Sequence, residues 1–238
     1  MNEIVRGRVA RETGEGHDLL AALMAARDED GSRMAERQLL DEAMTMLLAG
    51  HETTALALSY SLYLLAMNPQ AQQQLQDEIA SVLGDRSAGW DDLPQLEFAR
   101  QVVTEAMRLY PPADVLGREA VEDCQIGDIP VPRGTTIFMS QWVMHRDERF
   151  FKDPVRFEPS RWTKQFEQTL PRFAYFPFGG GPRNCVGQNF AVTEAVLILV
   201  EMCRRYAFAP VDGFKLELWP NITLRPKDGI SLSVKRKY

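Results

Sequence analysis

Cysteine and histidine are scarce in this chain, whose 238 residues hold three of each. Three widely spaced cysteines form no disulfide framework, so the sequence predicts a cytoplasmic or cytosol-facing protein in a reducing environment. Basic charge is not in excess: the net charge is −6, and the only basic run is 235–237. This excludes a general nucleic-acid binder. The segment 1–16 lacks the apolar stretch of a signal peptide, and no internal repeat is visible.

The composition that is present, 45% hydrophobic and 25% charged, is that of an ordinary globular protein. Apolar periodicity with Pro and Gly boundaries predicts helices. We expect them at 18–27, 33–67, 70–83, 96–109 and 190–202.

Between and after these helices the apolar period changes. Runs at 115–121 and 135–142 predict a small antiparallel sheet, and short strands are expected at 214–218, 221–224 and 230–234. The segment 152–178 is rich in Pro, Phe and Arg and predicts a long irregular stretch. The predicted fold is therefore mainly α with small antiparallel β-sheets (α+β), in one partial domain over 1–238 with a poorly ordered segment at 1–17.

The long helix is apolar nearly all round over 45–66, which predicts burial on every side or a transmembrane span. His51, Glu52 and Thr53 lie near its middle, where lipid would penalise them, so a buried helix with a polar waist is favoured. Gly50 and the hydroxyl of Thr53 predict a dent or bend there. A zinc-peptidase motif is excluded because Ala55 stands where a second His is needed.

A second feature is the glycine loop 178–187, in which three consecutive glycines allow close approach to the main chain. Cys185 follows them and precedes a helix, a position that favours a thiolate. Arg183 adds a fixed positive charge. Two alternatives remain open from the residues alone: a phosphate-binding loop and a cysteine buried as a small hydrophobe.

At this loop the sequence resembles the haem loop of the cytochrome P-450 superfamily. The signature runs Phe, small residue, any, Gly, any, Arg, any, Cys, apolar, Gly, and 178–187 fills every fixed position. The resemblance implies that Cys185 is the thiolate ligand of haem iron and that Phe178 lies at the cofactor. The segment 49–54 resembles the family's oxygen-binding helix segment, which implies Gly50 at the cofactor and proton delivery by Glu52 and Thr53.

Three further positions match the same family. Glu105 and Arg108 form a Glu-x-x-Arg pair, which the family locks to an Arg in a Pro-x-Arg-aromatic segment, here Arg161. The resemblance implies a structural triad. It also implies that Arg118 joins Arg183 in pairing with the haem propionates. Taken alone, each of these residues is equally an ordinary surface charge.

Trp142 and Arg146 have a spacing that the family uses elsewhere for a propionate contact. We expect Trp142 to end a strand, so the spacing is interpreted as coincidence. His145 is expected to cap or brace the end of the sheet.

The resemblance implies a monooxygenase with haem b, fed with NAD(P)H electrons by a ferredoxin or a flavoprotein reductase. Its substrate would be a small, largely apolar organic molecule facing 45–49, 113–116 and 219–222. Because proteins of the family are longer, this chain is expected to be the C-terminal part of the fold without the N-terminal part, and to hold haem poorly or not at all on its own. Membrane association is left open. The alternative is a non-catalytic helical scaffold without haem.

Overall fold

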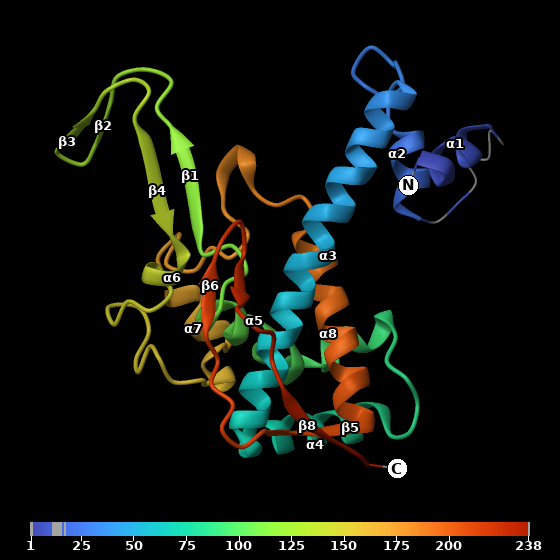
Figure 1. Ribbon diagram of the computed structural model, residues 1–238, viewed down its shortest axis with the longest axis vertical. Helices are drawn as coiled ribbons and strands as arrows, with labels where there is room; N and C mark the ends of the chain where they lie inside the picture. Colours follow the sequence, from blue (N-terminus) through green and yellow to red (C-terminus); the bar gives the residue numbers. More distant parts are fainter. Residues whose placement is uncertain (1, 11–15, 17, 238) are drawn as a thin grey trace. The chain divides into compact units, whose positions relative to one another are not determined.

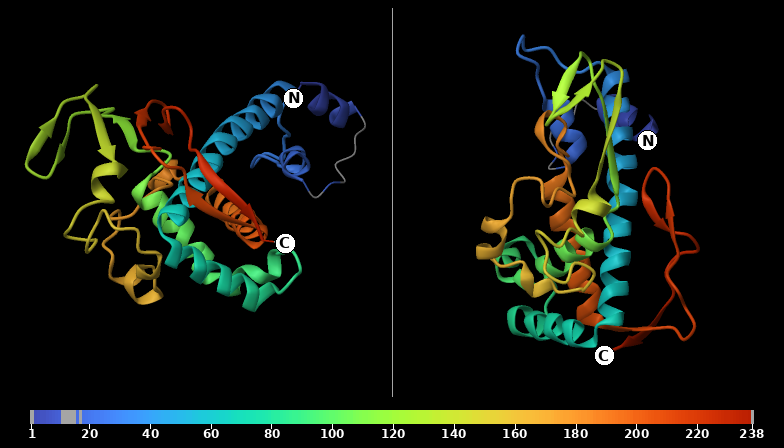
Figure 2. Two further views of the ribbon diagram at one scale, coloured as in Figure 1. Left: turned by 60° about the horizontal axis from the view of Figure 1, so that its bottom comes forward. Right: turned by 90° about the vertical axis from the view of Figure 1, so that its left-hand side faces the viewer.

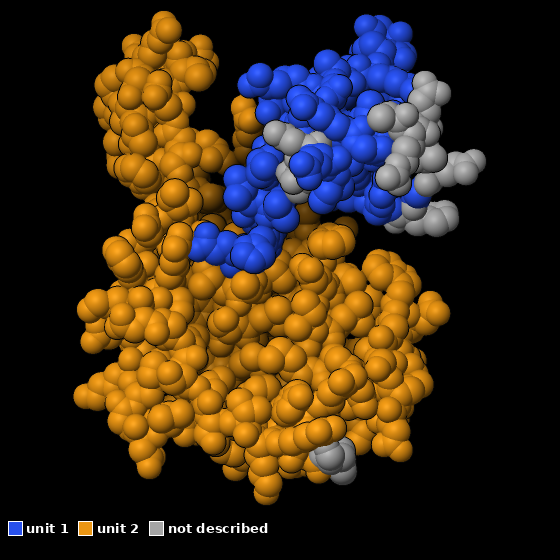
Figure 3. Space-filling model, turned by 45° about the vertical axis from the view of Figure 1, so that its right-hand side comes forward, with its two compact units in different colours: residues 1–52 blue, residues 53–238 orange. Residues whose placement is uncertain are grey.

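The computed structural model describes residues 2–10, 16 and 18–237. These fall into two compact units, Met1–Glu52 and Thr53–Tyr238, which Figure 3 colours separately. Within the described residues, no helix combines the length and apolarity that a membrane span requires.

Unit 1 contains α1 (Asn2–Ala10), α2 (Leu19–Ala25) and the first part of α3 (Glu36–Met67). The side chain of Asp18 caps α2 by accepting the N–H of Ala21 at 2.9 Å, and it also pairs with Arg8. Helix α1 lies within the segment expected to be poorly ordered, and the sequence did not predict it. The rest of that segment is largely outside the described residues.

Helix α3 runs without a break through both units because no proline or capping glycine interrupts it. It ends at Met67, Asn68 is the N-cap of the next helix, and Pro69 begins α4 (Pro69–Leu83), where its fixed φ suits the first helical position. These boundaries agree with the sequence prediction to within three residues.

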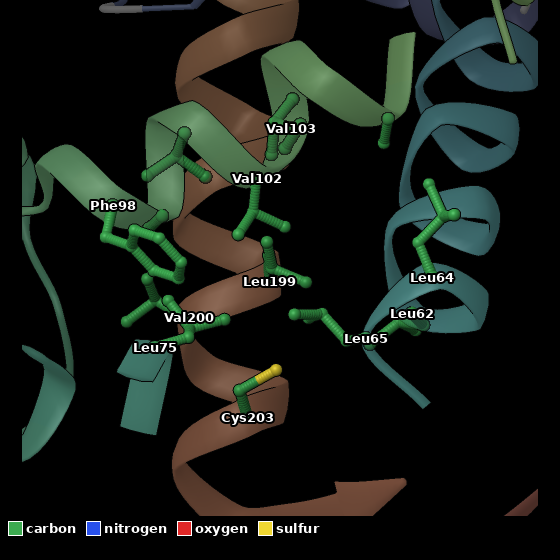
Figure 4. Close-up of a cluster of buried hydrophobic side chains, with 14 of the residues drawn as sticks. Leu62, Leu64, Leu65, Leu75, Phe98, Val102, Val103, Leu199, Val200 and Cys203 are labelled. Atoms are coloured by element: carbon green, nitrogen blue, oxygen red, sulfur yellow. The ribbon is translucent and has the colours of Figure 1, made fainter. Parts of the chain in front are cut away.

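The core of unit 2 forms where α4, α5 (Glu97–Leu109) and α8 (Gln188–Arg205) pack together with the last turns of α3. Helix α5 is buried along nearly its whole length. Figure 4 shows apolar side chains of the four helices converging. The labelled residues are Leu62, Leu64, Leu65, Leu75, Phe98, Val102, Val103, Leu199, Val200 and Cys203. Burial among them raises the pKa of the Cys203 thiol to about 12, which keeps that cysteine neutral.

Four antiparallel strand pairs complete unit 2. The first, β1 (Val115–Glu119) with β4 (Thr136–Ser140), is a ribbon that leaves the helices. It carries the hairpin β2 (Cys124–Ile126) and β3 (Ile129–Val131) at its far end (Figure 1). The ribbon was predicted. The strands of the β2–β3 hairpin were not predicted; the hairpin turns at Gly127, which has φ 58°.

The other two pairs follow α8. Strand β5 (Tyr206–Pro210) continues directly from that helix and pairs with β8 (Leu232–Arg236) at its C-terminal end (Figure 2). Strands β6 (Leu218–Pro220) and β7 (Leu224–Pro226) form the last pair. The sequence predicted three strands in this region, each starting two to four residues early, and missed β5. The fold is mainly α with small antiparallel sheets, as predicted.

Short helices interrupt the segments predicted to be extended or irregular. Helix α6 (Gln141–Met144) begins where β4 ends, so the prediction of a strand through Trp142 is wrong. The hydroxyl of Ser140 caps α6 by accepting the N–H of Val143, which explains the switch from strand to helix. Other short helical segments are α7 (Lys164–Thr169) and 3₁₀ turns at Trp90–Gln95, Pro159–Arg161 and Gly181–Arg183. Residues 145–158 and 170–180 contain no helix or strand, in agreement with the predicted irregular stretch over 152–178.

Candidate functional site

The glycine loop that leads into α8 is closed by two backbone hydrogen bonds. The N–H of Gly179 donates to the carbonyl of Phe176, and the N–H of Cys185 donates to the carbonyl of Phe178, both at 2.9 Å. Gly179 and Gly181 have φ values of 75° and 69°, which other L-residues adopt only at a cost. The loop therefore turns back on itself and brings Cys185 next to Phe178.

Gly180 is required for a different reason. Its backbone is extended, so any residue could adopt its conformation, but there is no room for a side chain. A Cβ there would lie 2.3 Å from the ring of Phe173. Phe173 itself has φ 67°, which is unusual for an aromatic residue and indicates local strain. The ring of Phe173 thus occupies the space that a side chain at 180 would need.

The thiol of Cys185 is exposed, and apolar side chains beside it in the sequence are exposed as well. Val186 is 90% exposed and Phe190, in the first turn of α8, is 70% exposed. Large exposed apolar side chains around a reactive group are typical of a surface that an apolar ligand or partner covers.

Arg118 and Arg183 are both exposed, and neither forms an ion pair with any residue that the structure describes. Arg118 lies on β1 two residues from Leu116, so the two share a face of the ribbon. Leu116 lies against Gly179, where an added Cβ would be 3.4 Å from its Cδ1. Arg118 is therefore on the side of the ribbon that faces the glycine loop, which Figure 1 shows rising beside β1.

The most buried charges of unit 2 meet at Glu105. Its Oε1 accepts hydrogen bonds from Arg108 at 2.8 Å and Arg161 at 3.1 Å, and its Oε2 accepts from Arg108 and from the indole of Trp162, both at 2.8 Å. The N–H of Glu158 also donates to Oε1. The structure thus brings together the residues of the predicted triad and adds Trp162. Arg108 also donates to backbone carbonyls of the irregular segment, so the cluster fixes that segment to α5.

The polar waist of α3 is divided between the units: Gly50 and Glu52 belong to unit 1 and Thr53 to unit 2. No side chain lies within 4 Å of where a Cβ at Gly50 would be, so this part of the helix surface is open. Glu52 and Thr53 are half-buried. The next residue, Thr54, is buried, and its hydroxyl has no hydrogen-bond partner among the described residues.

A sequence model of the cytochrome P-450 family matches residues 2–234. The chain belongs to the cytochrome P-450 family. Cyclooctatin synthase of Streptomyces melanosporofaciens is 38% identical over 90% of this chain, and the match covers 47% of that relative. Cyclooctat-9-en-7-ol 5-monooxygenase of the same organism is 37% identical over 91% of this chain and is also covered to 47%.

Among solved structures, the crystal structure of a cytochrome P-450 matches with a TM-score of 0.91 and 27% identity. The match covers all of this chain and 55% of that one. The chain therefore has the C-terminal part of the cytochrome P-450 fold, and it spans about half the length of the curated relatives it matches. The family consists of haem-binding oxidoreductases that receive electrons from a redox partner.

The residues around Cys185 fit a haem group on chemical grounds. The thiol is exposed rather than turned into the core, the loop offers bare backbone, and two guanidinium groups without ion pairs are available for carboxylates. In the part of the chain that is described, no cluster of three or more His, Cys, Asp or Glu side chains could hold a bare metal ion.

Two features of this region differ from the sequence interpretation. Trp142 lies in helix α6, and the guanidinium of Arg146 stacks 3.3 Å from the centroid of its ring. The spacing therefore does reflect a contact, although Arg146 also points inward to the carbonyl of Leu109. His145 does not cap the sheet but is fully buried against the segment that enters the glycine loop.

Proposed function

We propose that the chain is the haem-ligand portion of a cytochrome P-450 monooxygenase, with Cys185 as the thiolate ligand of the iron of haem b. The exposed thiol at the end of the closed glycine loop is the observation that carries this proposal. When bound, haem supplies the activation of dioxygen and the insertion of one oxygen atom into a C–H or C=C bond of the substrate.

The residues near the loop would bind and orient the cofactor. Gly181, beside which nothing lies within 4 Å of an added Cβ, leaves backbone that a flat ring system could approach, and Phe178 lies at the base of the loop. Arg118 and Arg183 would pair with the two propionates, since a guanidinium binds a carboxylate with two parallel hydrogen bonds. The triad Glu105, Arg108 and Arg161 would hold the preceding segment in place without touching the reacting atoms.

We also propose that Glu52 and Thr53 hold and deliver protons, with Gly50 leaving room beside them. A half-buried carboxyl and a half-buried hydroxyl on adjacent residues could hold a proton at the carboxyl oxygen of Glu52 and relay it through the hydroxyl of Thr53. Electrons would come from NAD(P)H through a ferredoxin or a flavoprotein reductase.

The substrate would be largely apolar. The two Streptomyces relatives are named for cyclooctatin and for a cyclooctatenol, and we propose a hydrocarbon-rich substrate for this chain as well. The ranges 113–116 and 219–222 of unit 2 include Val115, Trp219 and Ile222, which are exposed and apolar. Together with 45–49 of α3 they are the positions proposed to face it.

We further propose that residues 1–238 form part of one domain and that the protein is cytoplasmic or cytosol-facing. Because the chain covers about half of its relatives, it is expected to retain haem weakly. The test is pyridine haemochrome analysis of the purified chain before and after incubation with excess haem. Iron porphyrin bound at one per chain supports the proposal, and no uptake even in excess would favour a scaffold without haem.

A further inference from the structure

His145 follows helix α6 and is the residue that links the Glu105 cluster to the glycine loop. Its side chain is fully buried. Its ring packs against Tyr175 and Phe176, with centroids 4.9 and 5.3 Å away. Its backbone is fixed as well, because Arg108 donates a hydrogen bond to its carbonyl at 2.8 Å.

The hydrogen bond that the imidazole makes determines its protonation. Nε2 accepts the backbone N–H of Phe176 at 2.9 Å, so this nitrogen carries no proton. A neutral ring must then carry its proton on Nδ1, which is buried and faces the backbone of Met107. The charged groups that face the ring are Arg108 and Arg146, both positive, and Arg108 is paired with Glu105. The neutral form is therefore the one that fits this environment.

Two backbone hydrogen bonds connect the segment at Phe176 to Cys185. The carbonyl of Phe176 accepts the N–H of Gly179, and the carbonyl of Phe178 accepts the N–H of Cys185. Both are the bonds that close the loop. Two side chains anchor this turn from outside at Phe176: the imidazole of His145 accepts its N–H at 2.9 Å, and the side-chain amide of Gln141 donates to its carbonyl at 3.5 Å. The bond to His145 is the shorter of the two.

We propose that His145 is a positioning residue for Cys185. Its neutral imidazole fixes the peptide at Phe176, this peptide fixes the turn at Gly179, and the turn sets the direction in which the thiol projects. The positioning itself does not depend on a cofactor. Its consequence for iron ligation rests on the proposed function.

The tautomer can be tested in the unaltered chain. The sequence contains three histidines, so imidazole ¹⁵N signals are readily resolved and His145 is assigned with His145→Gln. We expect a neutral ring with the proton on Nδ1 at pH 7. A proton on Nε2, or on both nitrogens, would overturn the proposal, because Nε2 could not then accept the Phe176 amide.

The coupling to the cysteine is tested by comparing His145→Leu with His145→Gln. Leu removes the acceptor, whereas the side-chain oxygen of Gln can replace Nε2. Losing one hydrogen bond predicts roughly three- to tenfold faster amide exchange over 176–185 in the Leu variant, with recovery in the Gln variant. Exchange in α4 serves as the internal reference.

The reactivity of the thiol gives a second readout. In a Cys124→Ser background Cys185 is the one exposed cysteine, since Cys203 is buried. We expect its rate of alkylation by iodoacetamide to change in His145→Leu and to return in His145→Gln. Equal rates in all three proteins, or a Gln variant that behaves like Leu, would show that His145 only fills space. If Cys185→Ser left the haem spectrum unchanged while these results held, the proposed function would fail and the positioning role would stand.

Discussion

Replacing Glu105 by Gln keeps the size of the side chain and removes its charge. In the structure Oε1 receives Arg108, Arg161 and the Glu158 N–H, and Oε2 receives Arg108 and Trp162. A Gln amide nitrogen cannot accept a hydrogen bond, so at least the two donors at one oxygen lose their acceptor.

The cost is large because Arg108 and Glu105 are both fully buried. Removing one member of a buried ion pair leaves an uncompensated charge in the core and typically costs about 3–5 kcal/mol. Since small proteins unfold with about 5–15 kcal/mol, this is a considerable part of the total stability. The burial of Arg108 rather than the number of contacts decides the magnitude.

Urea unfolding followed by far-ultraviolet circular dichroism measures this cost, provided that the slope of the transition is unchanged. The matched control is Glu217→Gln, which removes an ion pair with Lys227 in which both side chains are more than half exposed. An exposed pair contributes about 0–1 kcal/mol, so this control should be nearly silent. If Glu105→Gln cost no more than the control, the cluster would not be the structural anchor described above.

Three further predictions concern the loop, the buried histidine and the long helix. Gly179→Ala should lower the free energy of unfolding by about 1–2 kcal/mol, because residue 179 has φ 75°. Gly50→Ala should raise it by up to about 1 kcal/mol, because Gly50 lies in a helix interior with open space beside it. Urea unfolding measures both changes, and a change in the same direction for the two variants would contradict the reasoning. Burial, with Arg108 and Arg146 nearby, lowers the pKa of His145 to about 3, so below pH 6.5 the unfolded chain takes up a proton that the native state refuses. The free energy of unfolding should therefore fall as the pH drops below 6.5, by at most about 1.4 kcal/mol per pH unit from this residue, and His145 should contribute no pH dependence above 6.5. Urea unfolding at pH 7.5, 6.0 and 5.0 should show that this contribution is missing in His145→Gln. The same dependence of the unfolding free energy on pH in both proteins would refute the prediction. In haem-loaded protein supplied with electrons, Thr53→Ala should divert electrons to peroxide, and an unchanged ratio of product to electrons consumed would reduce Thr53 to a packing residue.

Five helices (α2, α3, α4, α5 and α8) were predictable because their signals are local. No proline occurs between Glu36 and Met67, Pro69 restarts the next helix, and Pro111 ends α5. The strand pairs were found less accurately, since a strand is defined by its partner: β5 pairs with β8, whose residues lie more than twenty positions away. Sequence periodicity contains no information on that pairing.

At the candidate site, too, features set by local sequence were predictable, and features set by tertiary contacts were not. The glycine loop and Cys185 follow from residue types in a fixed order, so the sequence identified them directly. The role of His145 did not follow, because it depends on which amide its Nε2 meets and on burial that only tertiary packing creates. The short helix at Trp142 was missed because a Ser cap overrode the β-branched pattern before it.

The central claim is that Cys185 provides the thiolate for haem iron. The direct measurement is the absorption spectrum of the reduced, carbon monoxide-bound chain in excess haem, compared between Cys185→Ser and the control Cys124→Ser, whose thiol is also exposed. The account predicts a thiolate-type Soret band in the unaltered chain and in the control, and its loss in Cys185→Ser. The same band in Cys185→Ser would contradict the account.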